Sequence, residues 1–350
     1  MIRPYIFSPL VIGLIGMLHL FDPSPSHAHD SVTQQSTAEL PFITTRNRTG
    51  RSDPDDFFGD ERGGEFSGWC HVRQISIPGL SSIAEAAPFR IPWEFMSVTG
   101  IREAPLENIY SALEPADTTR GPLIYTHGYN ISFEKGCRRA VSLQYNANLK
   151  DGFLWFGWPS DGVLTNYMRD ETDLFWSAPS LADVIADMSG RFAPKKVNVA
   201  GHSLGGRGVA LALYIMAAQH PEVKLENVVL LAPDMDFETF NRILPTIRDL
   251  AARFTIYTSV DDRALDLSEN LHGYPRLGQS GNRVETLQGV EVIDVSEFVI
   301  DSASGHLYHI YGKLVGNDLD QLLNQGLGAA ERENLKQLGY NHWSLQEDDW

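Results

Sequence analysis

One ten-residue stretch limits the folds open to this chain more than any other. Residues 197–206 read V-N-V-A-G-H-S-L-G-G, so a short apolar run ends in G-x-S-x-G, and a helical pattern follows over 206–219. A serine at the tip of a tight strand-to-helix turn needs neighbours without bulky side chains, because only then can the turn form and the hydroxyl stand clear of the sheet. The stretch therefore predicts a strand, a sharp turn that presents Ser203, and a helix.

Short apolar runs and helical patterns alternate along the chain from Val72 onward. The run 228–231 is apolar at every position, which is typical of a parallel strand buried on both faces. Eight strands are predicted, at 72–77, 95–99, 123–126, 153–158, 197–200, 228–231, 254–258 and 290–295. Helices are predicted at 134–148, 180–192, 206–219, 237–250 and from 318 into the tail. This order predicts an α/β fold, with one mostly parallel eight-stranded sheet and helices on both faces.

The N-terminal residues predict export to the periplasm or the medium. Arg3 precedes an apolar run, and residues 26–28 offer small side chains at the positions that a signal peptidase reads, so residues 1–28 are predicted to be a signal peptide. The alternative is an uncleaved anchor, which Pro9 within the run disfavours. After cleavage no stable membrane insertion is expected. Residues 29–68 are polar without a sustained apolar period and are predicted to be a flexible lead-in to one catalytic domain over 69–350.

The charge balance and the missing motifs exclude several classes of function. Of the 350 residues, 28 are Lys or Arg and 45 are Asp or Glu, which gives a formal net charge of -17 and argues against a nucleic-acid partner. No Walker pattern, HExxH helix or CxxC pair occurs, so neither a cofactor nor a metal is predicted. Cys70 and Cys137 either form a disulfide or are two separate buried thiols, and the sequence leaves both alternatives open. It does not predict an oligomeric state.

A serine is a poor nucleophile by itself, so a base and an orienting acid are needed, and in this architecture they follow it in the order Ser, Asp or Glu, His. Asp262 follows the predicted strand 254–258, at the sheet edge where ligands of open α/β sheets bind, and is our candidate acid. Asp234, after the preceding strand, is the alternative. The loop after the last predicted strand carries two histidines, and His306 is preferred to His309 as the base because a flexible glycine precedes it.

Two backbone N–H groups are expected to hold a developing oxyanion. One belongs to Leu204, the residue after the serine, and the other to Tyr129, in the loop after the third predicted strand. Asn130 and Met235 come after predicted strands and Trp158 ends one, and all three are predicted to line the substrate pocket.

Seven short motifs together resemble a bacterial α/β-hydrolase family, catalogued as esterase/lipase-like proteins of unknown function. They lie at 126–130, 157–162, 201–206, 232–236, 262–265, 271–273 and 305–306. The resemblance covers about residues 72–311 and implies an α/β-hydrolase fold with Ser203, Asp262 and His306 as a catalytic triad. It favours Asp262 over Asp261, because Asp262 occupies the position that matches the motif. It implies no substrate.

The expected reaction is hydrolysis of a small-molecule carboxylic ester through an acyl-enzyme on Ser203. The same triad can cleave an amide, a thioester or a lactone, and a non-catalytic envelope binding protein on a hydrolase fold is the alternative from another class. A lid would follow the sixth predicted strand, yet only 21 residues, 233–253, lie between Ala232 and Phe254. No large lid domain is therefore predicted, and short-chain or aryl esters are favoured.

Overall fold

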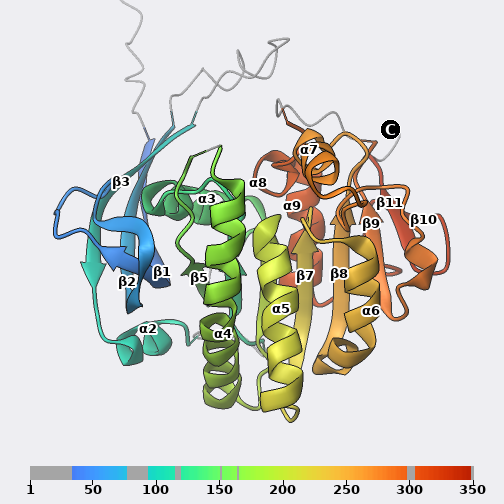
Figure 1. Cartoon of the computed structure of the whole chain (residues 1–350), viewed down its shortest axis with the longest axis horizontal. Coiled ribbons are helices and arrows are strands. Elements are labelled where there is room, and N and C mark those ends of the chain that lie inside the picture. The colour runs from blue at the N-terminus through green and yellow to red at the C-terminus, as the bar shows by residue number, and fades with distance from the viewer. Residues whose placement is uncertain are drawn as a thin grey trace, which may run out of the picture.

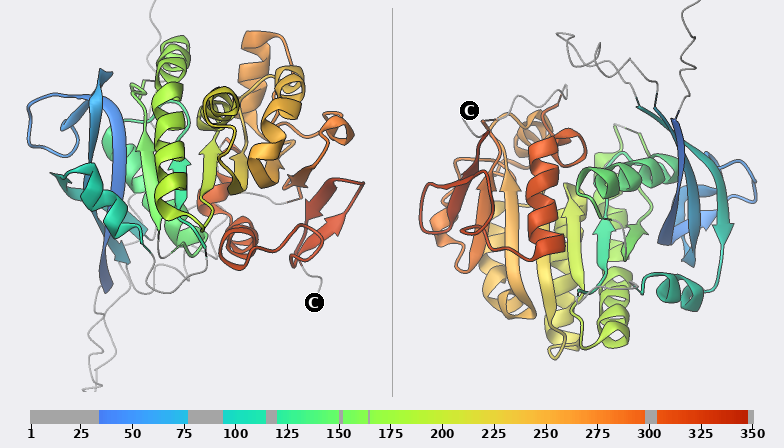
Figure 2. Two further views of the ribbon diagram at one scale, coloured as in Figure 1. Left: turned by 90° about the horizontal axis from the view of Figure 1, so that it is seen from below. Right: turned by 180° about the vertical axis from the view of Figure 1, so that it is seen from behind.

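The computed structural model describes residues 34–76, 94–114, 120–149, 152–163, 165–297 and 304–347. An eleven-stranded sheet crosses this part of the chain, in the order β10-β11-β9-β8-β7-β6-β4-β5-β1-β2-β3, and helices cover both of its faces (Figure 1 and Figure 2). Within these ranges no helix is both long and apolar enough to span a bilayer. The predicted signal peptide over 1–28 lies outside the described residues.

The elements have the following bounds. The strands are β1 (Gln34–Arg48), β2 (Phe58–Ser76), β3 (Glu94–Glu103), β4 (Leu123–Thr126), β5 (Phe153–Gly157), β6 (Asn198–His202), β7 (Leu225–Leu231), β8 (Ala251–Thr258), β9 (Val290–Asp294), β10 (Leu335–Gln337) and β11 (His342–Leu345). The helices are α2 (Leu106–Ala112), α3 (Phe133–Asn146), α4 (Tyr167–Phe192), α5 (Leu204–Gln219), α6 (Phe237–Ile247), α7 (Arg263–His272), α8 (Tyr308–Tyr311) and α9 (Lys313–Asp320).

The central strands from β5 to β9 are parallel and divide the interior into two hydrophobic cores. Along β7, Val228 and Leu230 pack into the core beneath α4, α5 and α6, whereas Val229 and Leu231 pack into the core beneath α3 and α9. Successive side chains of a strand point to opposite faces, so a strand covered on both sides is apolar at most positions. The predicted mostly parallel, doubly covered sheet is confirmed, and the structure adds three strands to the predicted eight.

The expectation of a flexible lead-in over 29–68 is wrong from residue 34 on. Here β1 pairs antiparallel with β2 and parallel with the central strand β5. Polar side chains of β1 are buried because distant backbone groups satisfy them. Thr44 Oγ1 donates to the Gly157 carbonyl at 2.5 Å, and the Arg46 guanidinium donates to the carbonyls of Gly59, Ser160 and Ile131 at 2.6–3.1 Å. Ala38, Leu40 and Phe42 alternate into the core, but the polar residues at 44–48 give no apolar signal, so the sequence shows only a short part of the strand.

The C-terminal tail is only partly helical. Leu319, Leu322 and Leu323 lie in the core, as the predicted helix requires, but the helical segment ends at Gln325. Beyond it, β10 and β11 form a hairpin, and Trp343 of β11 pairs parallel with Ile293 of β9. These two strands contribute only seven residues, too few for a clear alternation.

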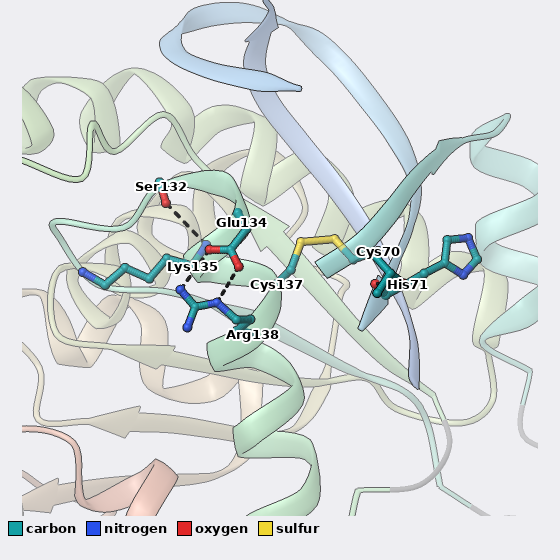
Figure 3. Close-up of a disulfide and its surroundings, with 8 residues drawn as sticks. Cys70, His71, Ser132, Glu134, Lys135, Cys137 and Arg138 are labelled. Carbon is teal, nitrogen blue, oxygen red and sulfur yellow. Dashed lines mark hydrogen bonds and ion pairs between the residues drawn. A yellow bond between two sulfur atoms is a disulfide. The ribbon is translucent and has the colours of Figure 1, made fainter. Parts of the chain in front are cut away.

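The two cysteines are joined in a disulfide, with an S–S distance of 2.00 Å and a Cα–Cα distance of 6.2 Å (Figure 3). Cys70 lies in β2 and Cys137 lies in α3, so the bridge ties the three N-terminal strands to the helix that follows the Tyr129 loop. The question that the sequence left open is answered in favour of pairing.

Candidate active site

Ser203 stands at a strained turn between β6 and α5. Its backbone has φ 55° and ψ -122°, a region that residues with a side chain rarely occupy. A Cβ atom on Gly201 would lie 2.5 Å from the Gly205 carbonyl oxygen, and one on Gly205 would lie 2.4 Å from that of His127. Both glycines are therefore required by close backbone contacts, and the predicted strand, turn and helix are all present.

The loop after β4 runs directly past the serine. A Cβ atom on Gly128 would come within 2.8 Å of the Ser203 Cβ, so the next residue, Tyr129, borders the same space. Leu204 is the first residue of α5, and the first N–H groups of a helix have no partner within it. The two residues whose N–H groups are predicted to hold an oxyanion are thus both neighbours of Ser203, Leu204 in the sequence and Tyr129 through the adjoining loop. Asp170 holds the loop in place, because its Oδ2 accepts the Asn130 N–H at 3.0 Å.

His306 and Asp262 form a hydrogen bond, with 2.6 Å between Nδ1 and Oδ2. Asp262 is fully buried and caps α7, and its Oδ1 accepts the N–H groups of Ala264 and Leu265 at 3.1 Å. These two amides fix one carboxylate oxygen and leave the other to the imidazole. The glycine before His306 has φ 67°, and a Cβ there would lie 2.1 Å from the Asp261 carbonyl oxygen, so this position cannot accept a side chain without movement of the loop.

Asp234 has entirely different partners. Its carboxylate accepts from Arg276 Nε at 2.8 Å, Ser268 Oγ at 2.6 Å and the Tyr167 hydroxyl at 2.5 Å, and it lies 3.5 Å from Arg207 Nη2. Burial alone raises the pKa of this carboxyl, but the two arginines and two hydroxyls outweigh burial and hold the pKa below its usual range. The carboxylate is fully engaged, and within the described chain no hydrogen bond joins it to His306.

The other histidines near the serine are buried and neutral. His309 is fully buried and stacks on His202 with ring centroids 4.0 Å apart, so it is not exposed to a substrate. Burial lowers the pKa of His127, His202 and His309 well below the ordinary value. His202 Nε2 lies 3.0 Å from the His306 carbonyl oxygen and supports the loop that carries it. Of the two candidate bases, His306 is the one at the pocket.

A pocket of about 490 Å³ opens at the carboxyl ends of the central strands. Its lining consists of Tyr129, Asn130, Lys135, Arg139, Tyr167, His202, Ser203, Asp234, Arg263, Ala264, Leu265, Leu267, Ser268, Leu271, Ser304, His306 and Leu307. Asn130 lines it as predicted.

The placement of Trp158 and Met235 in the pocket lining is wrong. The Trp158 indole is fully buried, stacks on His127 at 5.0 Å and donates to the His127 carbonyl at 2.9 Å. Met235 packs with Leu277 in the core beneath α6. A residue at a strand end can face the pocket or the interior, and these two are held inside by their neighbours. Sequence reasoning also missed Lys135 and Arg139, whose signal was a pair of cations four residues apart on the predicted helix 134–148.

Comparison with known proteins identifies the family of the chain. Residues 107–324 match the family described as alpha/beta hydrolase of unknown function (DUF900). The chain belongs to this family. An uncharacterized protein of a Nostoc species is 25% identical over 124 residues, which are 28% of this chain and 32% of that protein. The chain thus spans about a third of the length of that relative.

Solved structures of other hydrolases are similar at low identity. A putative cell surface hydrolase from Lactobacillus plantarum is 14% identical, covers 60% of this chain and 93% of its own, and gives a TM-score of 0.39. A predicted CIB-like hydrolase from Thermoplasma acidophilum is 14% identical, and the match covers 83% of this chain and 100% of that protein with a TM-score of 0.40. Est1E from Butyrivibrio proteoclasticus is 14% identical, and the match covers 60% of this chain and 90% of that protein with a TM-score of 0.38.

The site contains a serine hydroxyl, an imidazole and a buried carboxylate, from Ser203, His306 and Asp262, and this set can carry out acyl transfer. Among the described residues, no group of three or more His, Cys, Asp or Glu is placed to hold a metal ion.

Proposed function

We propose that this α/β hydrolase is a serine esterase that cleaves short-chain or aryl carboxylic esters through an acyl-enzyme. The observation that carries the proposal is the 2.6 Å hydrogen bond between His306 and the buried Asp262, in a pocket that also contains Ser203 at its strained turn. Strain at a residue with a side chain persists where function requires that geometry.

In the proposed mechanism His306 takes the proton of Ser203 Oγ while the serine attacks the ester carbonyl. The N–H groups of Tyr129 and Leu204 hold the oxyanion, and His306 then protonates the leaving alcohol. Asp262 keeps Nδ1–H directed at its carboxylate and stabilises the imidazolium that forms. Water repeats the cycle on the acyl-enzyme and releases the acid.

The size of the pocket supports modest substrates. A volume of about 490 Å³ accommodates a short acyl or aryl group, and leucines of α7 give one side an apolar lining. Between β7 and β8 the chain forms only α6 and one short turn, so no lid domain is inserted there. We expect the rate to be highest on dissolved esters, without a jump when the substrate begins to aggregate.

Labelling with a fluorophosphonate, followed by a panel of esters of graded acyl length with a matched amide, thioester and lactone, tests the proposal. We expect the label on Ser203, none on Ser203→Ala, and turnover by the variant reduced by several orders of magnitude. Absence of both label and turnover in the folded wild type would instead support a non-catalytic binding protein. A strong preference for long-chain emulsions would contradict the substrate size.

We further propose that the protein is exported, in keeping with a disulfide that persists in oxidising compartments. N-terminal sequencing of protein recovered from the periplasm or the medium should begin at His29. Recovery of only uncleaved protein in the membrane fraction would support the anchor instead.

A further inference from the structure

The pocket carries more positive charge than an acidic protein of net charge -17 leads one to expect. Lys135 and Arg139 of α3 line it, whereas Arg263 at the start of α7, which also lines it, already interacts with another residue. The one carboxylate in the lining is that of Asp234, which Arg207 and Arg276 already neutralise. The pocket within the described chain is therefore short of negative charge.

Arg139 shows this shortage most clearly. It is only partly exposed, and no carboxylate or hydrogen-bond acceptor of the described residues pairs with its guanidinium. Its neighbour Arg138 faces elsewhere and binds Glu134 through two hydrogen bonds of 2.5 and 2.9 Å (Figure 3). Burial lowers the pKa of Arg139, so folding desolvates this cation without a compensating anion. Desolvated charges are normally paired, so a site of this kind fits an anion supplied by a ligand.

Lys135 lies one helical turn before Arg139 and borders the same pocket. Its Nζ donates to the Asn130 carbonyl at 2.7 Å, which holds the ammonium beside the loop that passes Ser203. An ammonium has three donors, and two remain after this bond. Residues four apart on a helix share a face, so the two cations can bind one group together.

The other lining of the pocket is apolar. Leu265, Leu267 and Leu271 of α7 contribute to it, with Leu307 from the loop that carries His306. A ligand that fits both sides has an apolar part and a single negative group. The planar fork of a guanidinium binds a carboxylate through two parallel hydrogen bonds.

We propose that the substrate of this site is an ester that carries a carboxylate, bound by Arg139 and Lys135, with its apolar part against α7. The inference rests on the proposed esterase function. The carboxylate can belong to the acyl chain or to the alcohol, and both share the chemistry of a monoanion within reach of the ester carbonyl.

Three phenyl esters distinguish a carboxylate on the acyl chain from one on the alcohol. Phenyl pentanoate is neutral, monophenyl glutarate carries the carboxylate on the acyl chain, and 4-carboxyphenyl pentanoate carries it on the alcohol. We expect kcat/KM of the wild type to be at least about tenfold higher for one of the anionic esters than for the neutral ester, as a charged hydrogen bond provides. This preference should shrink as ionic strength rises.

Variants of α3 assign the preference to residues. Arg139→Gln should lower the ratio of anionic to neutral kcat/KM by about tenfold or more, Lys135→Gln should lower it by a smaller factor, and Arg139→Lys should restore part of it. Arg138→Gln is the matched control, because it removes a cation of the same helix that does not line the pocket, and it should leave the ratio within about twofold.

The two proposals can fail separately. If the wild type cleaves phenyl pentanoate at least as well as both anionic esters and Arg139→Gln leaves the ratio unchanged, the anion site is wrong and the esterase stands. If no ester is cleaved and Ser203 takes no label, the esterase fails. Calorimetric binding of pentanoate, a monoanion with an apolar chain, then decides the anion site, since binding that Arg139→Gln weakens supports it and equal or absent binding overturns it. If Arg139→Gln does not fold, the ratio of anionic to neutral kcat/KM in Lys135→Gln and its salt dependence in the wild type test the anion site instead. A ratio that neither the substitution nor salt lowers overturns the site.

Discussion

Two buried carboxylates follow adjacent parallel strands, Asp234 after β7 and Asp262 after β8, and their surroundings differ completely. Asp262 accepts two backbone N–H groups and the imidazole of His306. Asp234 lies between two arginines and accepts two hydroxyls. The position after a strand therefore does not by itself select a triad acid. A carboxylate already paired with guanidinium groups has its charge compensated, whereas one held by amides keeps its charge for an imidazole.

The largest expected effect is on catalysis and comes from the β8 carboxylate. Asp262→Asn should lower kcat on phenyl pentanoate by about four orders of magnitude, because the imidazole loses its preferred tautomer. Asparagine still caps a helix well, so the melting temperature should change little. Steady-state kinetics and a thermal scan on the same preparation check both statements. A mild loss of kcat would remove Asp262 from the triad.

The β7 carboxylate should behave in the opposite way. Asp234→Asn leaves Arg276 buried without the charge that compensates it, whereas Arg207 keeps its ion pair with Glu171, so the free energy of unfolding should fall by about 3–5 kcal/mol. Well below the melting temperature, kcat should stay within about tenfold of the wild type. Denaturant unfolding and steady-state kinetics of both variants, measured in parallel, check this prediction. If Asp234→Asn abolished turnover and Asp262→Asn did not, Asp234 would be the triad acid.

The buried histidines extend the comparison to pH. Burial holds the pKa of His127, His202 and His309 below the unfolded value of about 6.5, so the unfolded state binds more protons and stability falls as pH drops below about 6.5. Each such histidine contributes up to about 1.4 kcal/mol per pH unit. His309→Phe should reduce the slope of stability against pH, because it removes one of these titrating groups. Both ring nitrogens of His309 lack a hydrogen-bond partner, so the substitution breaks no hydrogen bond. Urea midpoints between pH 7.5 and 5.5 measure the slope, and an unchanged slope would show that His309 does not contribute.

The smallest expected effect tests one hydroxyl of the Asp234 group. Tyr167→Phe removes the 2.5 Å hydrogen bond to the carboxylate and should lower the free energy of unfolding by about 1–2 kcal/mol. Tyr145→Phe, at an exposed tyrosine of α3, is the control and should be neutral. If urea unfolding gave the same free energy of unfolding for the two variants, the Tyr167 hydroxyl would contribute nothing to stability.

The parts of the molecule that the sequence predicts are those with a local signal. Strands β4 to β9 could be found because burial on both faces gives each of them a short, mostly apolar run. The turn at Ser203 could be found because its glycines are required by backbone contacts close in sequence or near the serine.

The rest depends on contacts between distant residues. Strand β1 buries Thr44 and Arg46 against carbonyls up to 114 residues away. The role of Asp234 follows from neighbours 27–67 residues away, and that of Trp158 from a neighbour 31 residues away. No spacing rule reports such partners, so the arginines and hydroxyls around Asp234 and the residues of the pocket lining needed the structure.

The central claim is that an ester passes its acyl group to Ser203. Mixing the enzyme with phenyl pentanoate, quenching with acid during the first turnovers and mapping the peptides by mass spectrometry tests this directly. We expect a mass increase equal to the pentanoyl group on the peptide that contains Ser203, and none in Ser203→Ala. Steady turnover of the ester with no adduct, or with the adduct on another residue, would contradict the account.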